Sequence, residues 1–206
     1  NSVGIDLFDR STPSLFAPSN ALACAKRLLA SLPEKRIFTT IGASFPGKRW
    51  PVENWIDFLS PLAAEGWGIV LVGHGKEEEF IASQIKGKIQ SDLVLDLVSK
   101  LNFVNMLGVA NLCTAAVGND TGPMHIAAMS GVPSIVISDY LQTPEVGYTM
   151  PWLISVTMFG LPEGKTLYTR QRSAETLRKI SGERVLCEFE RLLTLDAPVR
   201  PYWEAE

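Results

Sequence analysis

The segment that decides the fold is RIFTTIGASFPGKRWPVENWIDFLSPLAAEGWGIVLV, residues 36–72 of the chain. It opens with a strand-like run over residues 36–41 and closes with residues 68–72, whose apolar sequence is typical of a strand buried on both faces. Between them, apolar residues recur at helical spacing over residues 51–65, with Pro51 suited to the first turn and Gly66 to the C-terminal cap. The segment therefore predicts one strand–helix–strand unit of a parallel sheet.

The same alternation continues along the chain. We expect further strands at residues 93–97, 112–117 and 134–137, and helices at residues 77–85, 102–110 and 123–130. The pattern then loosens until Ser181 caps a final helix that ends near residue 193. At the other end, Ser19 is expected to cap a helix over residues 20–32. The prediction is an α/β fold with a Rossmann-like, doubly wound parallel sheet over residues 36–193, an N-terminal segment (1–35) that leads into it, and a C-terminal tail (194–206).

The composition is that of an ordinary globular chain. It has 206 residues, 46% of them hydrophobic, which is enough to bury a full core. Its net charge of -3 argues against a nucleic-acid-binding domain, which usually carries a basic surplus. The cysteines, Cys24, Cys113 and Cys187, lie too far apart to indicate a disulfide framework or a zinc site. Neither a signal peptide nor an apolar stretch of the roughly 20 residues that a transmembrane helix needs is present, so we expect a cytoplasmic chain. Because it begins at Asn1 rather than Met, we also expect a piece of a longer protein.

A phosphate-binding pattern follows the first predicted strand. Residues 42–51 (GASFPGKRWP) match the G-x-x-x-x-G-K of a phosphate loop, but Arg49 stands where the magnesium-binding Ser or Thr belongs, and Pro46 removes a backbone donor. A magnesium-dependent NTPase is therefore disfavoured. The remaining backbone N–H groups, the Ser44 hydroxyl and two cations near a helix N-terminus suit a diphosphate without a metal.

A second such loop is residues 118–125 (GNDTGPMH). Small and polar residues end a predicted strand, and Pro123 suits the first turn of the following helix, whose N-terminal N–H groups can hold phosphate oxygens. Asp120 would repel a diphosphate if it faced one. We expect it to accept hydrogen bonds from neighbouring backbone donors, which leaves the Thr121 and Gly122 amides for a ligand.

Other interpretations of the two loops stay open. Lys48 and Arg49 could simply cap and solvate the first loop, and the second could be an ordinary Asx turn. The first loop nearly matches the G-x-S-x-G of serine hydrolases, but proline replaces the last glycine and neither His74 nor His125 has an evident acid partner. A packed, neutral imidazole is the ordinary reading of His125.

A third loop argues against two further classes of site. Residues 73–79 (GHGKEEE) begin as G-x-G, but Glu78 occupies the third glycine position of the dinucleotide fingerprint. We expect Glu78 and Glu79 to lie in a solvated first helical turn. The chain has no D-x-D motif and only two histidines, with no clustered carboxylates, so a catalytic metal is not expected.

Three strings together resemble glycosyltransferase family 9, the bacterial heptosyltransferases of lipopolysaccharide core assembly. They are GASFPGKRWPVENW at residues 42–55, VLVGHGKEE at residues 70–78 and GNDTGPMHIAAMSGVPSIVI at residues 118–137, and the likeness extends over residues 37–193. The resemblance implies one half of a GT-B type glycosyltransferase, in which two Rossmann-like domains face each other across a cleft. This chain is similar to the C-terminal half, which binds the nucleotide-sugar donor, possible donors including ADP-heptose.

The resemblance also implies roles for individual residues. Ser44 and Lys48 would contact the diphosphate, Glu77 would reach the ribose, and the region of Leu101 would pack on the base. The remaining residues that it assigns to the donor site are Asp120, Thr121, Gly122 and His125, the last at a motif position with no assigned role. Lys48 would be catalytic by stabilising the charge that develops on the departing diphosphate, rather than by moving a proton.

The family's activity sets further expectations. Its members invert configuration and need no metal or other cofactor, and their catalytic base and acceptor site belong to an N-terminal domain that we expect to be absent from residues 1–206. The chain also lacks the family's later cysteine-containing loop, because residues 148–171 contain no cysteine. We therefore expect a lipid-linked or oligosaccharide acceptor to bind through another domain, in the cytoplasm or at the inner face of the membrane. The alternatives are a non-catalytic nucleotide-binding module, a sugar-nucleotide epimerase and a P-loop-like hydrolase.

Overall fold

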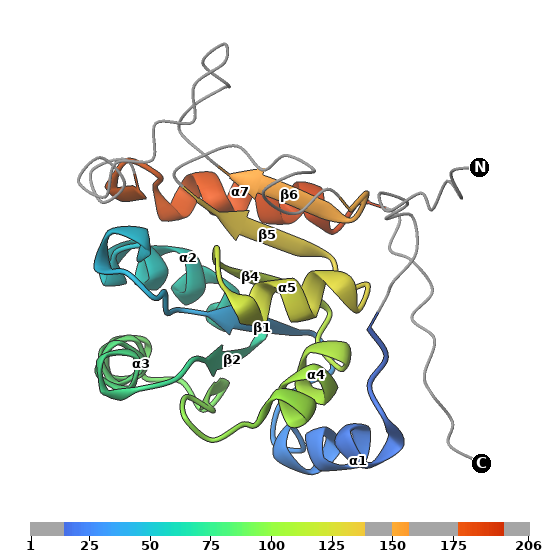
Figure 1. Cartoon of the computed structure of the whole chain (residues 1–206). Coiled ribbons are helices and arrows are strands. Elements are labelled where there is room, and N and C mark those ends of the chain that lie inside the picture. The colour runs from blue at the N-terminus through green and yellow to red at the C-terminus, as the bar shows by residue number, and fades with distance from the viewer. Residues whose placement is uncertain (1–14, 139–149, 157–176, 196–206) are drawn as a thin grey trace, which may run out of the picture.

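A parallel sheet forms the centre of the molecule. The computed structural model describes residues 15–138, 150–156 and 177–195. Within these residues six strands pair in the order β3-β2-β1-β4-β5-β6, and every pairing is parallel (Figure 1). The strands are β1 (Arg36–Thr40), β2 (Gly68–Val72), β3 (Val94–Asp96), β4 (Ala115–Asn119), β5 (Ser134–Ile137) and β6 (Leu153–Val156). This is the doubly wound order of a Rossmann-like fold, and the predicted fold class is confirmed.

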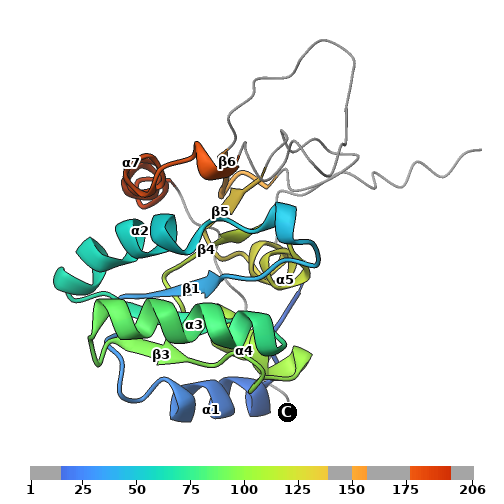
Figure 2. The same ribbon diagram turned by 90° about the vertical axis from the view of Figure 1, so that its left-hand side faces the viewer.

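Helices cover both faces of the sheet. On one face α1 (Ser19–Leu28) packs on α4 (Phe103–Asn111), which packs on α5 (Gly122–Met129). On the other face α2 (Val52–Ala64) packs between α3 (Lys76–Ile89) and α7 (Gly182–Leu192). Figure 1 shows α2 and α3 on one side of the strands and α4 and α5 on the other, and Figure 2 shows α7 beside α2. The helix predicted to precede the domain is therefore one of its packed layers.

Alternation along the strands fills two separate cores. Ile37 of β1 packs on the α2 and α3 face, whereas the next residue, Phe38, packs on the α4 and α5 face, and β2, β4 and β5 divide their apolar residues in the same way. The first core also holds an edge-to-face cluster in which the rings of Trp50 and Trp55 lie 4.7 Å apart and Phe189 of α7 contacts Phe58. These rings join the loop after β1, the helix α2 and the helix α7.

Some predicted boundaries are wrong. Helix α1 begins after Pro18, which is its N-cap, and ends at Leu28 rather than at residue 32. The strand predicted at residues 112–117 is β4, shifted to Ala115–Asn119, because residues 112–114 form the turn that ends α4. The edge strand β6 was not predicted at all. The predicted caps Asn102 and Ser181 do begin α4 and α7, and each side chain accepts a backbone N–H bond.

Several sequence predictions lie mainly outside the described residues. These are the first 14 residues of the predicted N-terminal segment (1–35), the part of the predicted tail (194–206) after residue 195, and most of the cysteine-free segment 148–171.

Candidate functional site

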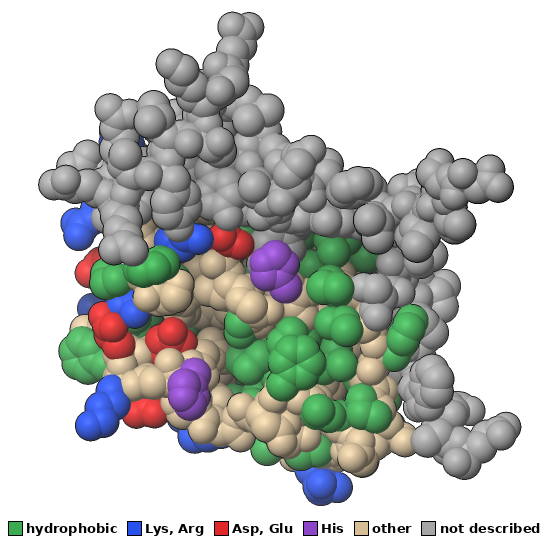
Figure 3. All heavy atoms as spheres, in the orientation of Figure 1, with side chains coloured by type: hydrophobic (Ala, Val, Ile, Leu, Met, Phe, Trp, Pro, Cys, Tyr) green, Lys and Arg blue, Asp and Glu red, His purple; other side chains and the backbone are tan. Residues whose placement is uncertain are grey.

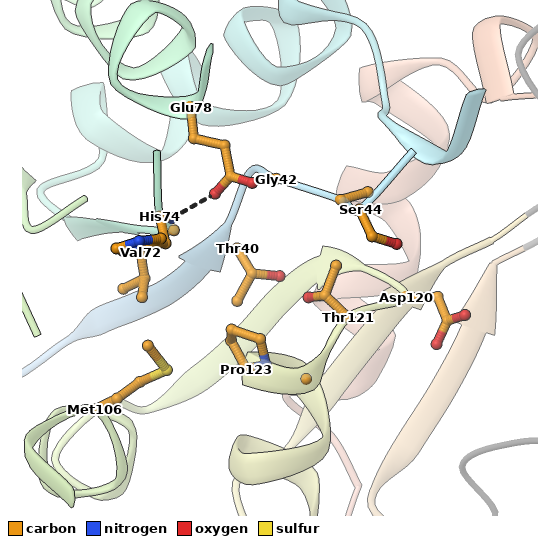
Figure 4. A pocket seen from close by; sticks show the side chains of 13 residues that line it. Thr40, Gly42, Ser44, Val72, His74, Glu78, Met106, Asp120, Thr121 and Pro123 are labelled. Carbon is orange, nitrogen blue, oxygen red and sulfur yellow. Dashed lines mark hydrogen bonds between the residues drawn. The ribbon is translucent and has the colours of Figure 1, made fainter. Parts of the chain in front are cut away.

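A pocket of about 240 Å³ opens at the carboxyl ends of β1, β2 and β4 (Figure 4). The sheet order reverses between β1 and β4, because the chain runs outward from β1 through β2 and β3 and from β4 through β5 and β6. Open parallel sheets bind ligands at such a reversal, because the loops on its two sides separate and leave a crevice. The residues lining the pocket are Thr40, Gly42, Ala43, Ser44, Val72, Gly73, His74, Glu78, Met106, Asp120, Thr121, Gly122 and Pro123.

The pocket brings together the two loops that the sequence singled out. Ser44 comes from the loop after β1, and Asp120, Thr121 and Gly122 come from the loop between β4 and α5. Gly122 begins α5, with Thr121 as an extended N-cap, so the N-terminus of this helix lies at the pocket wall. A helix N-terminus favours an anion because its N–H groups and its dipole present positive charge.

Lys48 reaches the second loop from the first. It ends the short 3-10 turn Pro46–Lys48, and its Nζ lies 3.2 Å from Asp120 Oδ2. The two side chains are 18% and 11% exposed, so the ion pair is largely sheltered from water. The structure therefore gives Asp120 a role that the sequence did not predict, that of holding the Lys48 ammonium at the end of β4. Its predicted bonds to backbone donors stay a prediction.

Glu78 forms another wall of the pocket. It lies in the first turn of α3, and its carboxylate accepts a 2.7 Å hydrogen bond from the backbone N–H of His74. A Cβ at either Gly42 or Gly73 would overlap this carboxylate, so the Glu78 side chain can occupy its observed position only while both residues are glycine. Burial raises the pKa of the Glu78 carboxyl, and the His74 hydrogen bond and the charge of Arg49 offset part of that rise.

Glu78 lies in the first helical turn as predicted, but it is half-buried rather than fully solvated, because the glycines that follow β1 and β2 leave the space that its carboxylate fills. The same prediction is confirmed for the exposed Glu79.

Four residues that the resemblance assigned to the donor site lie outside the lining of the pocket: Lys48, which reaches the lining residue Asp120, and Glu77, Leu101 and His125. Glu77 forms an ion pair with Arg49, and its side chain is 64% exposed. Leu101 is half-buried against the core beneath α4. His125 is 46% exposed, and its Nε2 lies 4.0 Å from Asp120 Oδ1. The acid partner that the sequence did not indicate for His125 is therefore nearby, although the two atoms are beyond hydrogen-bond distance. Their contacts with a donor stay predictions.

The sequence reading missed Met106 and Thr40, which the pocket includes. Met106 belongs to α4, whose position over β1 has no local signal in the sequence. Thr40 is the last residue of β1, and its place at a strand end was the one sign in the sequence that it could line the pocket. Figure 3 shows both histidine side chains on the face that carries the pocket, with an apolar surface beside them. Phe103 and Val104 of α4 are large apolar residues exposed to solvent.

The described residues offer neither a grouped set of metal ligands nor a membrane-spanning helix. In the ranges that the structure describes, no three His, Cys, Asp or Glu side chains are grouped so that they could hold a metal ion. Within those same ranges, every helix is too short or too polar to cross a membrane.

Comparison with known proteins identifies the family. The family model described as glycosyltransferase family 9 (heptosyltransferase) matches residues 6–178. The chain belongs to glycosyltransferase family 9. This family 9 chain is 31% identical over 161 residues to lipooligosaccharide heptosyltransferase 2 of Haemophilus influenzae. The match covers 74% of the chain and 45% of that protein. The resemblance found in the sequence is confirmed.

Solved structures show the same fold. The structure of E. coli ADP-heptose LPS heptosyltransferase II matches with a TM-score of 0.70 and 22% identity, over 87% of this family 9 chain and 53% of that chain. E. coli heptosyltransferase WaaC with ADP matches with a TM-score of 0.63 and 20% identity, over 82% and 48%. The chain spans about half the length of the curated relatives it matches.

Proposed function

We propose that this chain is the donor-binding half of an inverting, metal-independent glycosyltransferase that transfers heptose in lipopolysaccharide core synthesis. The observation that carries the proposal is the Lys48 ammonium, placed beside the N-terminus of α5 at the reversal of the sheet. Both features attract an anion with more than one oxygen, as the diphosphate of a nucleotide-sugar is. Membership of family 9, and a similar fold in a heptosyltransferase solved with ADP, support ADP-heptose as the donor.

The diphosphate is proposed to lie between the two loops. The Thr121 and Gly122 end of α5 and the exposed Ser44 hydroxyl would contact its oxygens, and Lys48 would reach it while paired with Asp120. An ammonium has three N–H donors, so it can bind a carboxylate and a phosphate together. When the sugar–phosphate bond breaks, negative charge grows on the leaving diphosphate, and a cation already fixed in place lowers the energy of that transition state.

The nucleoside is proposed to extend toward the ends of β1 and β2. Glu78 and Met106 line that part of the pocket and offer a carboxylate for sugar hydroxyls and an apolar surface for a base. The contacts of Glu77 with the ribose, of Leu101 with the base and of His125 with the donor remain part of the proposal. A lipid-linked or oligosaccharide acceptor would bind to another domain, at the cytoplasmic face of the membrane. That domain would also supply the catalytic base.

A titration tests the donor site. The chain is titrated calorimetrically with ADP, once with excess EDTA and once with magnesium. Equal affinity in both supports a metal-free diphosphate site, and binding that requires magnesium refutes it. The second candidate is a nucleotide-binding module without catalysis of its own. Transfer of heptose to a core acceptor by the chain alone would exclude that candidate.

A further inference from the structure

The carboxamide of Asn119 is fully buried between the two loops of the pocket, at the last residue of β4. Its Oδ1 accepts a 3.0 Å hydrogen bond from the backbone N–H of Trp50. Its Nδ2 donates to the carbonyls of Ile41 and Gly42, each at 3.1 Å. These bonds use both amide hydrogens and the carbonyl, so one side chain ties the beginning and the end of the loop 42–50 to β4.

The loop 42–50 carries Lys48, whose ammonium pairs with the residue that follows Asn119. Asp120 follows Asn119 directly and turns to the pocket, where it pairs with the Lys48 ammonium at 3.2 Å. The position of the loop relative to β4 therefore decides whether the ammonium reaches Asp120, which lines the pocket. The indole of Trp50 also donates to the carbonyl of Ile180 at 2.7 Å, which ties the end of the loop to the segment before α7 rather than to β4.

We infer that Asn119 is a positioning residue of the nucleotide site, which acts by closing the loop 42–50 onto β4 and so fixing Lys48 beside the α5 N-terminus. The inference rests on the proposed function for the identity of the ligand. The loop presents one N–H and two carbonyls at this point, a pattern that an asparagine amide matches. An aspartate would place a second acceptor against two carbonyls, and a leucine would leave all three groups without a partner.

A double-mutant cycle measures whether Asn119 acts through Lys48. ADP affinity is determined for Asn119→Ser in the unaltered chain and in the Lys48→Ala background. The matched control is Asn111→Ser, because Asn111 is also buried and donates to Leu107 within α4 at 3.3 Å, outside the lining of the pocket. We expect Asn119→Ser to weaken ADP binding about tenfold or more when Lys48 is present and less than about twofold when it is not. The control should change affinity less than about twofold in both backgrounds.

A second readout needs no ligand. The NMR signal of the Lys48 Cε protons, assigned by its loss in Lys48→Ala, should shift in Asn119→Ser because the pair with Asp120 opens, and should stay in place in Asn111→Ser. If Asn119→Ser does not fold, both measurements are made on Asn119→Thr, whose β-branched side chain suits a strand and whose hydroxyl keeps one donor.

The outcomes separate the inference from the proposed function. An equal loss of affinity with and without Lys48, no loss at all, or an unmoved Lys48 signal would overturn the positioning role. Failure of the unaltered chain to bind ADP would count against the proposed function, and the Lys48 signal would then decide the inference alone.

Discussion

Replacing Lys48 by alanine removes the cation that joins the two loops of the pocket. If Lys48 donates a charge-assisted hydrogen bond to a bound diphosphate, its loss costs about 1.5–3 kcal/mol, which is about 10- to 150-fold in ADP affinity. The structure adds a second term of the same sign. Asp120, only 11% exposed and 3.2 Å from Lys48 Nζ, loses its counter-charge beside the proposed position of the diphosphate. Repulsion between like charges about 4 Å apart is of order 1–4 kcal/mol between bulk water and a protein surface.

These two terms can be measured apart. Calorimetric titration with ADP is run on Lys48→Ala and on Lys48→Ala combined with Asp120→Asn. The double variant removes the repulsion but not the lost hydrogen bond, so it should bind ADP more tightly than Lys48→Ala and more weakly than the unaltered chain. Lys48→Arg should recover part of the affinity, because a planar guanidinium cannot replace a compact ammonium at the same point.

The fold itself should tolerate the change. Lys48 lies in a loop, and a partly exposed ion pair contributes about 0–1 kcal/mol, so Tm should fall by no more than about 4 °C. A folded Lys48→Ala chain with unchanged ADP affinity would refute the proposed role and leave Lys48 as a residue that solvates its loop. A double variant that binds no better than Lys48→Ala would refute the repulsion argument alone.

Three further predictions concern stability. Burial raises the pKa of Glu78 above its ordinary 4.5, so the native state holds the proton more tightly than the unfolded state does. The stability that this provides is lost as the pH rises through the raised pKa. The Tm of Glu78→Gln minus that of the unaltered chain should therefore be more positive at neutral pH than below pH 4.5. The buried hydroxyls of Thr39 and Thr40 have no hydrogen-bond partner within the described ranges, so valine at either position should leave Tm unchanged or raise it, and a clear fall would show that a water or an unseen group satisfies the hydroxyl. A Cβ at Gly118 would collide with Thr40 Oγ1 and Met124, so Gly118→Ala should cost about 1–3 kcal/mol in urea unfolding, and a neutral result would mean that the packing between β1, β4 and α5 can relax.

Local patterns predicted the elements of the fold well, and non-local contacts explain what they missed. The apolar runs of β1 and β2 and the helical spacing of α2 are periodic in the sequence, so this unit was predicted within a residue or two. Strand β6 has four residues, at the sheet edge, where its partial burial gives a weak pattern. Its position next to β5 depends on pairing rather than on its own composition.

The candidate site divides in the same way. The loops at residues 42–51 and 118–125 carry local signals, so their meeting at one sheet edge could be expected once a parallel sheet was predicted. The pairing of Lys48 with Asp120 joins residues 72 positions apart, and no periodicity encodes it. Glu78 has the sequence context of an exposed helix end, and its burial depends on glycines that two other strands supply.

The aromatic cluster under α7 determines when during synthesis the domain can finish folding. Phe189 of α7 packs edge-to-face on Phe58 of α2 and on Trp67 just before β2, and the indole of Trp50 donates to the carbonyl of Ile180. A growing chain released before residue 189 would expose these rings to water, although every strand from β1 to β6 had already been synthesised. The loop 42–50, which Trp50 ends, would also lack that anchor. The domain therefore depends on its last described helix, and folding during synthesis should complete only once α7 has left the ribosome.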